Sequence, residues 1–293
     1  METLSTVAAL RAALDDARLD GRSVGLVPTM GFLHDGHTSL IERAARDHDV
    51  VLTTIFVNPL QFAPTEDLGA YPRDPDGDAA RAAAAGATLL FTPADDEMYP
   101  DGRDGVLTSV TVEALSAVME GASRPEHFAG VCTVVAKLFN IAGPCTAYFG
   151  EKDFQQLAII RRMAFDLSFP VTVVGCPVVR EPDGLALSSR NVYLTDAERA
   201  AAPVLQRALR AGAAAVLDGR TDAAAVRALM ADVIATEPAG TIDYVDVVDA
   251  TTLLPLDVAG PDARLFGAVR FGRARLIDNI AVSDTIAGSG PTG

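Results

Sequence analysis

Short apolar runs alternate with segments of helical periodicity over the first 178 residues of the chain. The apolar runs have the length of buried strands, and the segments between them place apolar residues on one helical face. This alternation is typical of parallel β/α units, so it predicts a Rossmann-like α/β domain, with a doubly wound parallel sheet, over residues 1–178. The predicted strands are Val24–Val27, Val50–Val57, Thr88–Phe91, Ala147–Phe149 and Val171–Cys176, and the predicted helices are Thr6–Ala17, Gly36–Asp47, Pro75–Ala85, Phe128–Ile141 and Asp153–Asp166.

A different pattern follows Pro177. We interpret residues 179–293 as a smaller C-terminal α+β domain that acts as a lid. The tail, residues 283–293, is rich in Gly, Ser and Thr and is expected to be disordered. The elements predicted in this region are an alanine-rich helix over Asp196–Leu217, a second helix over Asp222–Ala235, and strands at Ile242–Val248 and Ala274–Ile277.

The composition excludes several classes of protein. The chain has 293 residues, 49% of them apolar, which is sufficient for one large domain and a smaller one. Its net charge of −15 argues against a nucleic-acid surface, because no basic field would attract phosphates. No apolar run has the length of a membrane span, and the acidic start does not resemble a signal peptide. Cys132, Cys145 and Cys176 are widely spaced, which favours reduced thiols and a cytoplasmic protein.

The turn after the first predicted strand carries two glycines and two histidines, in the order Met30-Gly31-Phe32-Leu33-His34-Asp35-Gly36-His37. Backbone N–H groups and the positive end of a helix dipole meet at such a helix start and favour a bound anion. His34 and His37 add hydrogen-bond donors, so this turn is a candidate nucleotide-phosphate site. A zinc pair, a helix cap and ordinary surface histidines are the alternatives, and the zinc pair lacks a third ligand at suitable spacing.

A second strand end turns through Gly150 and Glu151 into a predicted helix, and Lys152 is expected in the first turn of that helix. A cation there opposes the helix dipole, so a phosphate bound between the two would account for its position. The alternative is a solvated lysine beside Glu151 and Asp153. Asp153 is expected to cap the helix under either interpretation.

The junction between the two regions contains the polar run Ser188-Ser189-Arg190-Asn191. Serine hydroxyls donate neutral hydrogen bonds and a guanidinium contacts two oxygens at once, a combination that suits a triphosphate. A loop capped by serine at a helix start is the alternative. Together, the three turns indicate a nucleotide site more strongly than any one of them.

Two neutral amides follow the second predicted strand, at Asn58 and Gln61. They are suited to hold a hydroxy acid without adding charge, and the alternative for Asn58 is a plain turn before Pro59. Further along, Arg124–Gly130 leads a predicted helix and is a candidate lid element.

Five ordered motifs span nearly the whole chain: Pro28–His37, Asn58–Phe62, His127–Gly130, Gly150–Asp153 with Gln156, and Ser188–Asn191. They resemble the pantothenate synthetase family, the pantoate:β-alanine ligases of the nucleotidyltransferase superfamily with a HIGH-like histidine motif. The resemblance implies condensation of (R)-pantoate with β-alanine to pantothenate, AMP and pyrophosphate through a pantoyl adenylate. ATP would be a substrate and Mg²⁺ a cofactor, and the enzyme would be a cytoplasmic homodimer.

The same resemblance implies roles for single residues. His37, His34, Lys152, Ser188, Ser189 and Arg190 would act in catalysis, and His37 matches the residue usually assigned as proton donor. Gln61, Gln156 and Asn58 would bind substrate. The ATP-binding residues would be Met30, Gly31, Phe32, Leu33, His34, Asp35, Gly36, His37, Gly150, Glu151, Lys152, Asp153, Val179, Leu187, Ser188, Ser189 and Arg190.

The chain departs from the family pattern at several positions. Leu187 stands where the family usually has Met, which conserves volume, and Phe32 replaces a common Ala. Where the family often has an acidic pair and a Gln associated with magnesium, this chain has Gly77, Asp78 and Arg81. Asp78 is the candidate metal ligand, and ATP phosphates and water are expected to provide the others.

Two other functions are compatible with part of the pattern. A nucleotidyltransferase that adenylylates a phosphate acceptor without forming an amide would share the phosphate motifs but has no need for Gln61 and Gln156. An ATP-binding sensor without turnover could lose Lys152, His37 or Arg190, and all three are present.

Overall fold

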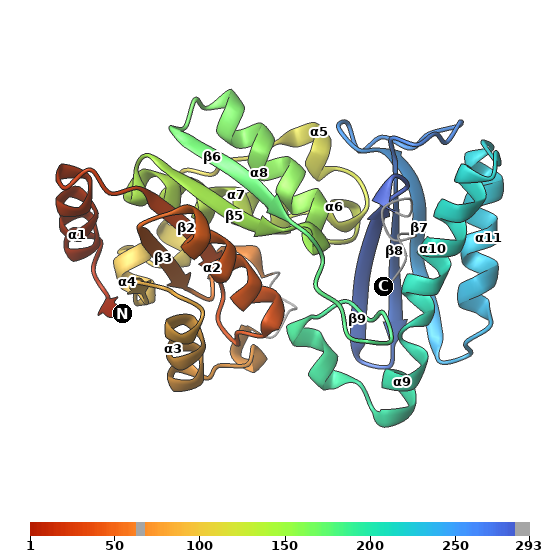
Figure 1. Ribbon diagram of the computed structural model, residues 1–293, viewed down its shortest axis with the longest axis horizontal. Helices are drawn as coiled ribbons and strands as arrows, with labels where there is room; N and C mark the ends of the chain where they lie inside the picture. The colour runs from red at the N-terminus through yellow and green to blue at the C-terminus, as the bar shows by residue number, and fades with distance from the viewer. Residues whose placement is uncertain (63–67, 285–293) are drawn as a thin grey trace. The chain divides into compact units, whose positions relative to one another are not determined.

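The computed structural model describes residues 1–62 and 68–284, and the chain divides into two compact units (Figure 1). Unit 1 consists of Met1–Glu151 and Gln155–Pro177, and unit 2 consists of Lys152–Phe154 and Val178–Gly293. The short segment Lys152–Phe154 therefore belongs to unit 2, although its neighbours in the sequence belong to unit 1. Of the tail predicted to be disordered, 283–293, residues 285–293 lie outside the described residues.

Unit 1 is built on a six-stranded parallel sheet, which confirms the predicted α/β class. The chain runs from β2 outward to β3 and β4 and then resumes on the other side of β2 with β5. The topological switch point therefore lies at the carboxyl ends of β2 and β5, where sheets of this kind bind ligands. In the order β1-β4-β3-β2-β5-β6, the strands are Glu2–Leu4, Leu89–Phe91, Val50–Ile55, Val24–Thr29, Cys145–Gly150 and Val171–Cys176.

Helices connect the strands of unit 1 (Figure 1). On α2, the spacing of Leu40, Ile41 and Ala44 produces a buried face that packs with Val27 and Leu90 of the sheet. The longer helices are α1 (Val7–Leu19), α2 (Asp35–Asp47), α3 (Pro75–Ala84), α7 (His127–Ala142) and α8 (Phe154–Asp166); the short ones are α4 (Asp95–Met98), α5 (Glu113–Ser116) and α6 (Glu120–Ser123), with 3₁₀ turns η1 (Pro59–Gln61), η2 (Leu68–Ala70), η3 (Arg103–Gly105) and η4 (Glu151–Asp153). Within the described part of the chain, no helix is both long and apolar enough to cross a bilayer.

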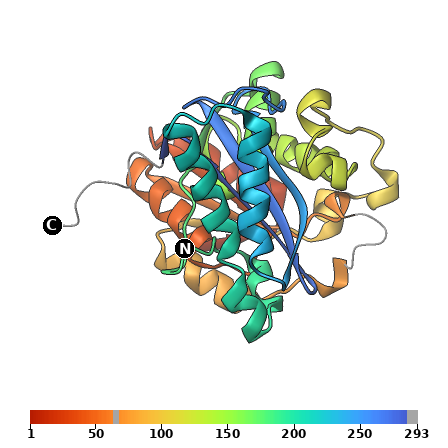
Figure 2. The same ribbon diagram turned by 90° about the vertical axis from the view of Figure 1, so that its right-hand side faces the viewer.

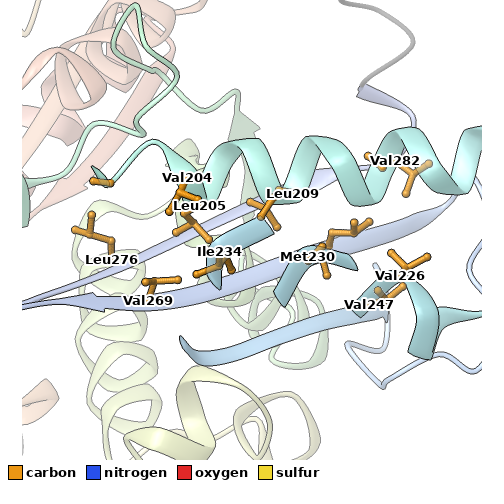
Figure 3. Close-up of a cluster of buried hydrophobic side chains, with 14 of the residues drawn as sticks. Val204, Leu205, Leu209, Val226, Met230, Ile234, Val247, Val269, Leu276 and Val282 are labelled. Atoms are coloured by element: carbon orange, nitrogen blue, oxygen red, sulfur yellow. The ribbon is translucent and has the colours of Figure 1, made fainter. Parts of the chain in front are cut away.

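Unit 2 contains an antiparallel sheet in the order β7-β8-β9, with α10 and α11 packed on one of its faces (Figure 2). The core between helices and sheet includes Leu209, Met230 and Val269, which come from α10, α11 and β8 (Figure 3). The elements are η5 (Ser189–Tyr193), α9 (Asp196–Ala201), α10 (Val204–Leu217), α11 (Ala223–Ala235), β7 (Gly240–Asp249), β8 (Ala263–Phe271) and β9 (Ala274–Ala281).

Several elements differ from the sequence-based predictions, among them the short helices α4, α5 and α6, which were not predicted. The single helix predicted over Asp196–Leu217 is wrong, because α9 ends at Ala201 and α10 begins at Val204. Pro203 lies at the break, where it has no N–H to donate and its ring does not fit inside a helix. Strands β1 and β8 were not predicted: β1 has only three residues, and β8 is buried on both faces and so lacks alternation.

Candidate active site

The turn between β2 and α2 contains two residues with a left-handed backbone. Gly31 has a φ of +83°, and a Cβ there would lie 2.9 Å from Asp78 Oδ2 and 3.0 Å from Ile55 Cγ2. Phe32 has a φ of +51°, which is unusual for an aromatic residue. The chain therefore reverses sharply at the switch point of the sheet, and only glycine fits at the first of these positions.

Asp78 of α3 anchors this turn. Its Oδ2 accepts a hydrogen bond from Phe32 N (2.8 Å), and its Oδ1 accepts one from Leu33 N (2.6 Å). The side chain is buried, with 3% of its surface exposed. Both carboxylate oxygens of the residue expected to bind magnesium are thus engaged by the backbone of the turn. These contacts account for the strained backbone at Phe32, which the sequence could not indicate.

The two histidines cap α2 through their Nδ1 atoms. His34 Nδ1 accepts a hydrogen bond from Gly36 N (3.1 Å), and His37 Nδ1 accepts one from His34 N (3.3 Å). A ring nitrogen that accepts carries no hydrogen, so each neutral ring has its hydrogen on Nε2. Both Nε2–H groups are consequently donors at the N-terminus of a helix, where the dipole favours an anion. The helix cap and the phosphate site are therefore compatible, because the cap uses Nδ1 alone.

Gln61 is oriented by a buried network of amides. Asn58 Nδ2 donates to Gln61 Oε1 (3.2 Å) and to Gly130 O (3.0 Å), and Gln61 Nε2 donates to Met30 Sδ (2.7 Å). Asn58 is 1% exposed and Gln61 is 8% exposed. Tyr99 OH donates to Asn58 Oδ1 (2.9 Å). Asn58 therefore orients Gln61, and its expected contact with substrate stays a prediction.

Tyr99 and Gly130 complete this network. Gly130 belongs to one of the five motifs, whereas no pattern in the sequence pointed to Tyr99. Burial raises the pKa of Tyr99, so its hydroxyl stays protonated and continues to donate. A Cβ at Gly130 would lie 2.3 Å from Leu60 O, so glycine allows α7 to approach η1 closely. His127 Nδ1 lies 3.0 Å from Gln61 O at the start of the same helix. The predicted lid element thus begins a helix that holds the backbone of η1.

Two adjacent glutamines at the start of α8 differ in their surroundings. Gln155 is 3% exposed; its Nε2 donates to Leu115 O (2.9 Å) and Val118 O (2.8 Å), and its Oε1 accepts from Glu120 N (3.1 Å). Gln155 therefore fixes the segment that contains α5 and α6. Gln156, the expected substrate ligand, is half-buried.

Lys152 lies in the 3₁₀ turn η4, two residues before the first residue of α8, so the prediction that it lies inside the first turn of the helix is wrong. The helix begins only at Phe154, after Lys152 and Asp153 have entered unit 2. Lys152 Nζ lies 3.2 Å from Asp153 Oδ1, and 18% of the lysine side chain is exposed. Lys152 and Ser188 line the same small pocket within unit 2.

A hairpin leads to the serine and arginine motif of unit 2. Leu187 N donates to Val179 O (3.0 Å), which pairs two of the expected ATP-binding residues. Ser188 then caps η5, since its Oγ accepts from Arg190 N (3.2 Å). Ser189 is half-buried and Arg190 is exposed. The serine cap, one of the alternatives from the sequence, is present alongside a cluster of polar donors.

The structure gathers the expected site residues in two groups. Those of unit 1 follow the carboxyl ends of its strands or lie beside them, and those of unit 2 lie on η4, on the hairpin and on η5. The first group is Met30, Gly31, Phe32, Leu33, His34, Asp35, Gly36, His37, Asn58, Gln61, Asp78, Gly150, Glu151 and Gln156; the second is Lys152, Asp153, Val179, Leu187, Ser188, Ser189 and Arg190.

The cysteines supply no nucleophile. All three are free thiols, and burial raises the pKa of Cys132 and of Cys145 to about 12 and also raises that of Cys176. At neutral pH they are therefore protonated. Chemistry at this site depends on the hydrogen-bond donors and cations described above.

Over most of its length, the chain is similar to pantoate-beta-alanine ligases, which are also named pantothenate synthetases. Residues 2–281 match the family model described as pantoate-beta-alanine ligase. The chain is 51% identical over 282 residues to a pantothenate synthetase of Moorella thermoacetica (96% of this chain, 99% of the relative) and 48% identical over 284 residues to one of Geobacter sulfurreducens (97% and 99%).

Two solved structures show the same likeness. One is the pantothenate synthetase from Thermus thermophilus, with a TM-score of 0.90 and 52% identity, covering 96% of this chain and 99% of that one. The other is a pantoate-beta-alanine ligase from Francisella tularensis complexed with beta-gamma ATP and beta-alanine, with a TM-score of 0.77 and 31% identity, covering 97% and 98%.

Proposed function

Because this chain belongs to the pantoate-β-alanine ligase family, we propose how its own residues join (R)-pantoate to β-alanine. The enzyme is an ATP-dependent ligase that forms pantothenate, AMP and pyrophosphate through a pantoyl adenylate. A carboxylate is a poor acyl donor because its leaving group would be oxide, whereas AMP leaves readily. The adenylate therefore divides one difficult step into two easier ones.

In the first step, a pantoate carboxylate oxygen attacks the α-phosphorus of ATP, and the bond from that phosphorus to the bridging oxygen of pyrophosphate breaks. The observation that carries the assignment is the paired histidine cap, which supports two Nε2–H donors at the N-terminus of α2. We assign His34 and His37 to the phosphate oxygens, with His37 as proton donor. Met30, Gly31, Phe32, Leu33, Asp35 and Gly36 line the nucleotide.

Negative charge moves onto the pyrophosphate as that bond breaks. In this proposal Lys152 and Arg190 neutralise the charge, while Ser188 and Ser189 donate neutral hydrogen bonds to the same phosphates. In this proposal the backbone of Gly150 and Val179 lies near the adenosine part of ATP, and Glu151, Asp153 and Leu187 also bind ATP. We also propose that residues 1–178, apart from Lys152–Phe154 of unit 2, act as the domain that binds ATP and pantoate, and that residues 179–293 act as the smaller lid domain.

In the second step, the β-alanine amine attacks the acyl carbon of the adenylate, and the bond from that carbon to the AMP oxygen breaks. We assign Gln61 and Gln156 to pantoate, with Gln61 also facing β-alanine. The Asn58 contact supports this role, because it fixes Gln61 Oε1 and so determines which way the amide presents its donor. Binding in the correct orientation supplies much of the rate enhancement when no protein nucleophile takes part.

Magnesium enters the reaction, in this proposal, with ATP. In this proposal Asp78 supports the turn, since each of its oxygens accepts a backbone N–H group. In the part of the chain that the structure describes, no three His, Cys, Asp or Glu side chains gather as a metal site. ATP phosphates and water are therefore the ligands that suit Mg²⁺, which commonly retains several waters.

The resemblance to the family also supports a cytoplasmic homodimer, which we propose for this chain. Light scattering on the purified protein tests the dimer. The reaction itself is tested by incubation with ATP, magnesium and pantoate, with and without β-alanine. Multiple turnovers of AMP that require both pantoate and β-alanine are the expected result. Pyrophosphate release without pantoate, or no product at all, would contradict the ligase assignment.

A further inference from the structure

Strand β9 holds two segments of unit 2 that carry proposed phosphate ligands. One segment is Lys152–Phe154, and the other is the hairpin 179–187 that leads to Ser188. The residues that hold them, Asn279 and Asp278, are adjacent in the strand and buried, with 2% and 4% of their surfaces exposed. Buried polar side chains are costly unless each of their groups has a partner, so their contacts identify what they do.

The Asn279 amide joins Lys152 to the sheet. Its Oδ1 accepts a hydrogen bond from Arg264 Nε (2.7 Å), and its Nδ2 donates to the backbone carbonyl of Lys152 (2.9 Å). Arg264 fixes the orientation of this amide, because a rotation by 180° would bring two donors together. The carbonyl of Lys152 is therefore held by a donor that is itself held in place.

The ring of Phe154 secures the other end of the same segment. Arg264 Cζ lies 3.5 Å from the ring centroid of Phe154, and the ring of Phe266 packs edge-on at 6.1 Å. Arg264 and Phe266 are two residues apart in β8, so they share one face of the sheet. Neighbouring Leu265 packs in the core with α10 and α11, so the face that holds Lys152–Phe154 is the opposite one.

Asp278 holds the hairpin. Its carboxylate accepts two hydrogen bonds from Arg180, at 2.6 Å from Nη1 and 2.9 Å from Nη2, and Arg180 Nη1 also donates to Gly184 O (3.1 Å). Such a bidentate pair fixes both position and orientation. Asp278 also lines the same pocket as Lys152 and Ser188. One strand thus provides a common support for both segments.

We propose that Asn279 is a positioning residue for adenylate formation, acting through Lys152. It fixes the Lys152 backbone on the strand whose Asp278 supports the approach to Ser188, so that the lysine ammonium and the serine hydroxyls keep one geometry. This inference rests on the proposed role of Lys152 toward the ATP phosphates. It assigns a part in the first step to a residue outside the five motifs.

Kinetics of the two half-reactions test this role. The Asn279→Asp variant keeps an acceptor for Arg264 but replaces the donor to Lys152, and Arg275→Gln on the same strand is the matched control. We expect pantoate-dependent ATP–pyrophosphate exchange to fall roughly 10- to 100-fold in Asn279→Asp, because a displacement of about 1 Å can have such an effect. Attack of β-alanine on supplied pantoyl adenylate should keep its rate. Asn279→Ala gives the same comparison if the introduced charge prevents folding.

A double-mutant cycle with Lys152→Ala distinguishes an effect of Asn279 that acts through Lys152 from a general effect on the structure of unit 2. If Asn279 acts through Lys152, Asn279→Asp lowers the exchange rate little further when the lysine side chain is already absent. An equal loss in both backgrounds, or unchanged exchange in Asn279→Asp, would overturn the proposal. Absence of exchange in the unmodified enzyme would instead refute the proposed function, and this inference with it.

A spectroscopic signal reports the contact directly. Lys152-Asp153 is the only Lys-Asp pair in the chain, which contains two lysines. Labelling lysine carbonyls with ¹³C and aspartate nitrogens with ¹⁵N therefore selects one amide signal, whose carbonyl partner accepts the Asn279 hydrogen bond. The signal should shift in Asn279→Asp and not in Arg275→Gln. An unchanged signal in Asn279→Asp would show that the contact is not made in solution.

Discussion

Replacing Asp78 by Asn should both destabilise unit 1 and weaken ATP use. The carboxylate accepts backbone hydrogen bonds from Phe32 N at 2.8 Å and Leu33 N at 2.6 Å, and it is buried. Asn offers one oxygen, and its NH₂ group faces the remaining N–H. A buried hydrogen bond to a charged group contributes about 1.5–3 kcal/mol, so losing one and weakening the other should lower the free energy of unfolding by about 2–4 kcal/mol.

Urea denaturation followed by circular dichroism, with steady-state kinetics on ATP, measures both effects. Asp76→Asn is the control, because Asp76 lies exposed in the first turn of the same helix. The KM for ATP should rise only in Asp78→Asn, since the turn lined by Gly31 and Phe32 loses its anchor. If the free energy of unfolding of Asp78→Asn lies within about 0.5 kcal/mol of the control, and its requirement for magnesium is changed, Asp78 does not anchor the turn and a role as metal ligand is favoured.

Three further predictions concern other parts of the molecule. Lys152→Ala should fold normally and lower adenylate formation about 100-fold in single-turnover assays; a near-normal rate would remove Lys152 from the mechanism. Tyr99→Phe deletes the hydroxyl that donates to Asn58. This change should lower the free energy of unfolding by about 1 kcal/mol and raise the KM for pantoate roughly fivefold, while the KM for ATP stays unchanged. Burial raises the pKa of Asp246, partly opposed by Arg227, so the folded state favours the neutral acid. Its contribution to stability is therefore present at low pH and lost as the pH rises through the raised pKa, and Asp246→Asn should increase the melting temperature at pH 7 but not at about pH 3; an equal increase at both would contradict this.

The sequence predicted the elements whose patterns are local. The strands at Val24 and Val50 and the helix after Gly36 follow from short-range periodicity, and the structure contains them. Strand β8 was missed because Gly267 interrupts a run that is buried on both faces. The break at Pro203 could have been predicted from the proline itself, but alanine content outweighed it in the helix prediction.

Contacts between distant residues explain what was not predicted in the candidate site. Asp78 supports a turn more than 40 positions earlier in the chain, and Tyr99 lies 41 residues from the amide that it orients. Such pairs leave no periodic trace in a single sequence. Motif residues such as His34 and Lys152 were found because they follow strand ends in turns that contain glycine, which is a local property.

The assignment of Lys152–Phe154 to unit 2 limits how the gene can be divided or recombined. A fragment covering residues 178–293 lacks the Phe154 ring that Arg264 and Phe266 contact, and it leaves the Asn279 amide without its carbonyl. Chimeras joined at residue 178 would combine a strand from one parent with a docking segment from the other. Chimeras of related enzymes should therefore fold more often when the codons for Lys152–Phe154 come from the same parent as the 3′ end of the gene.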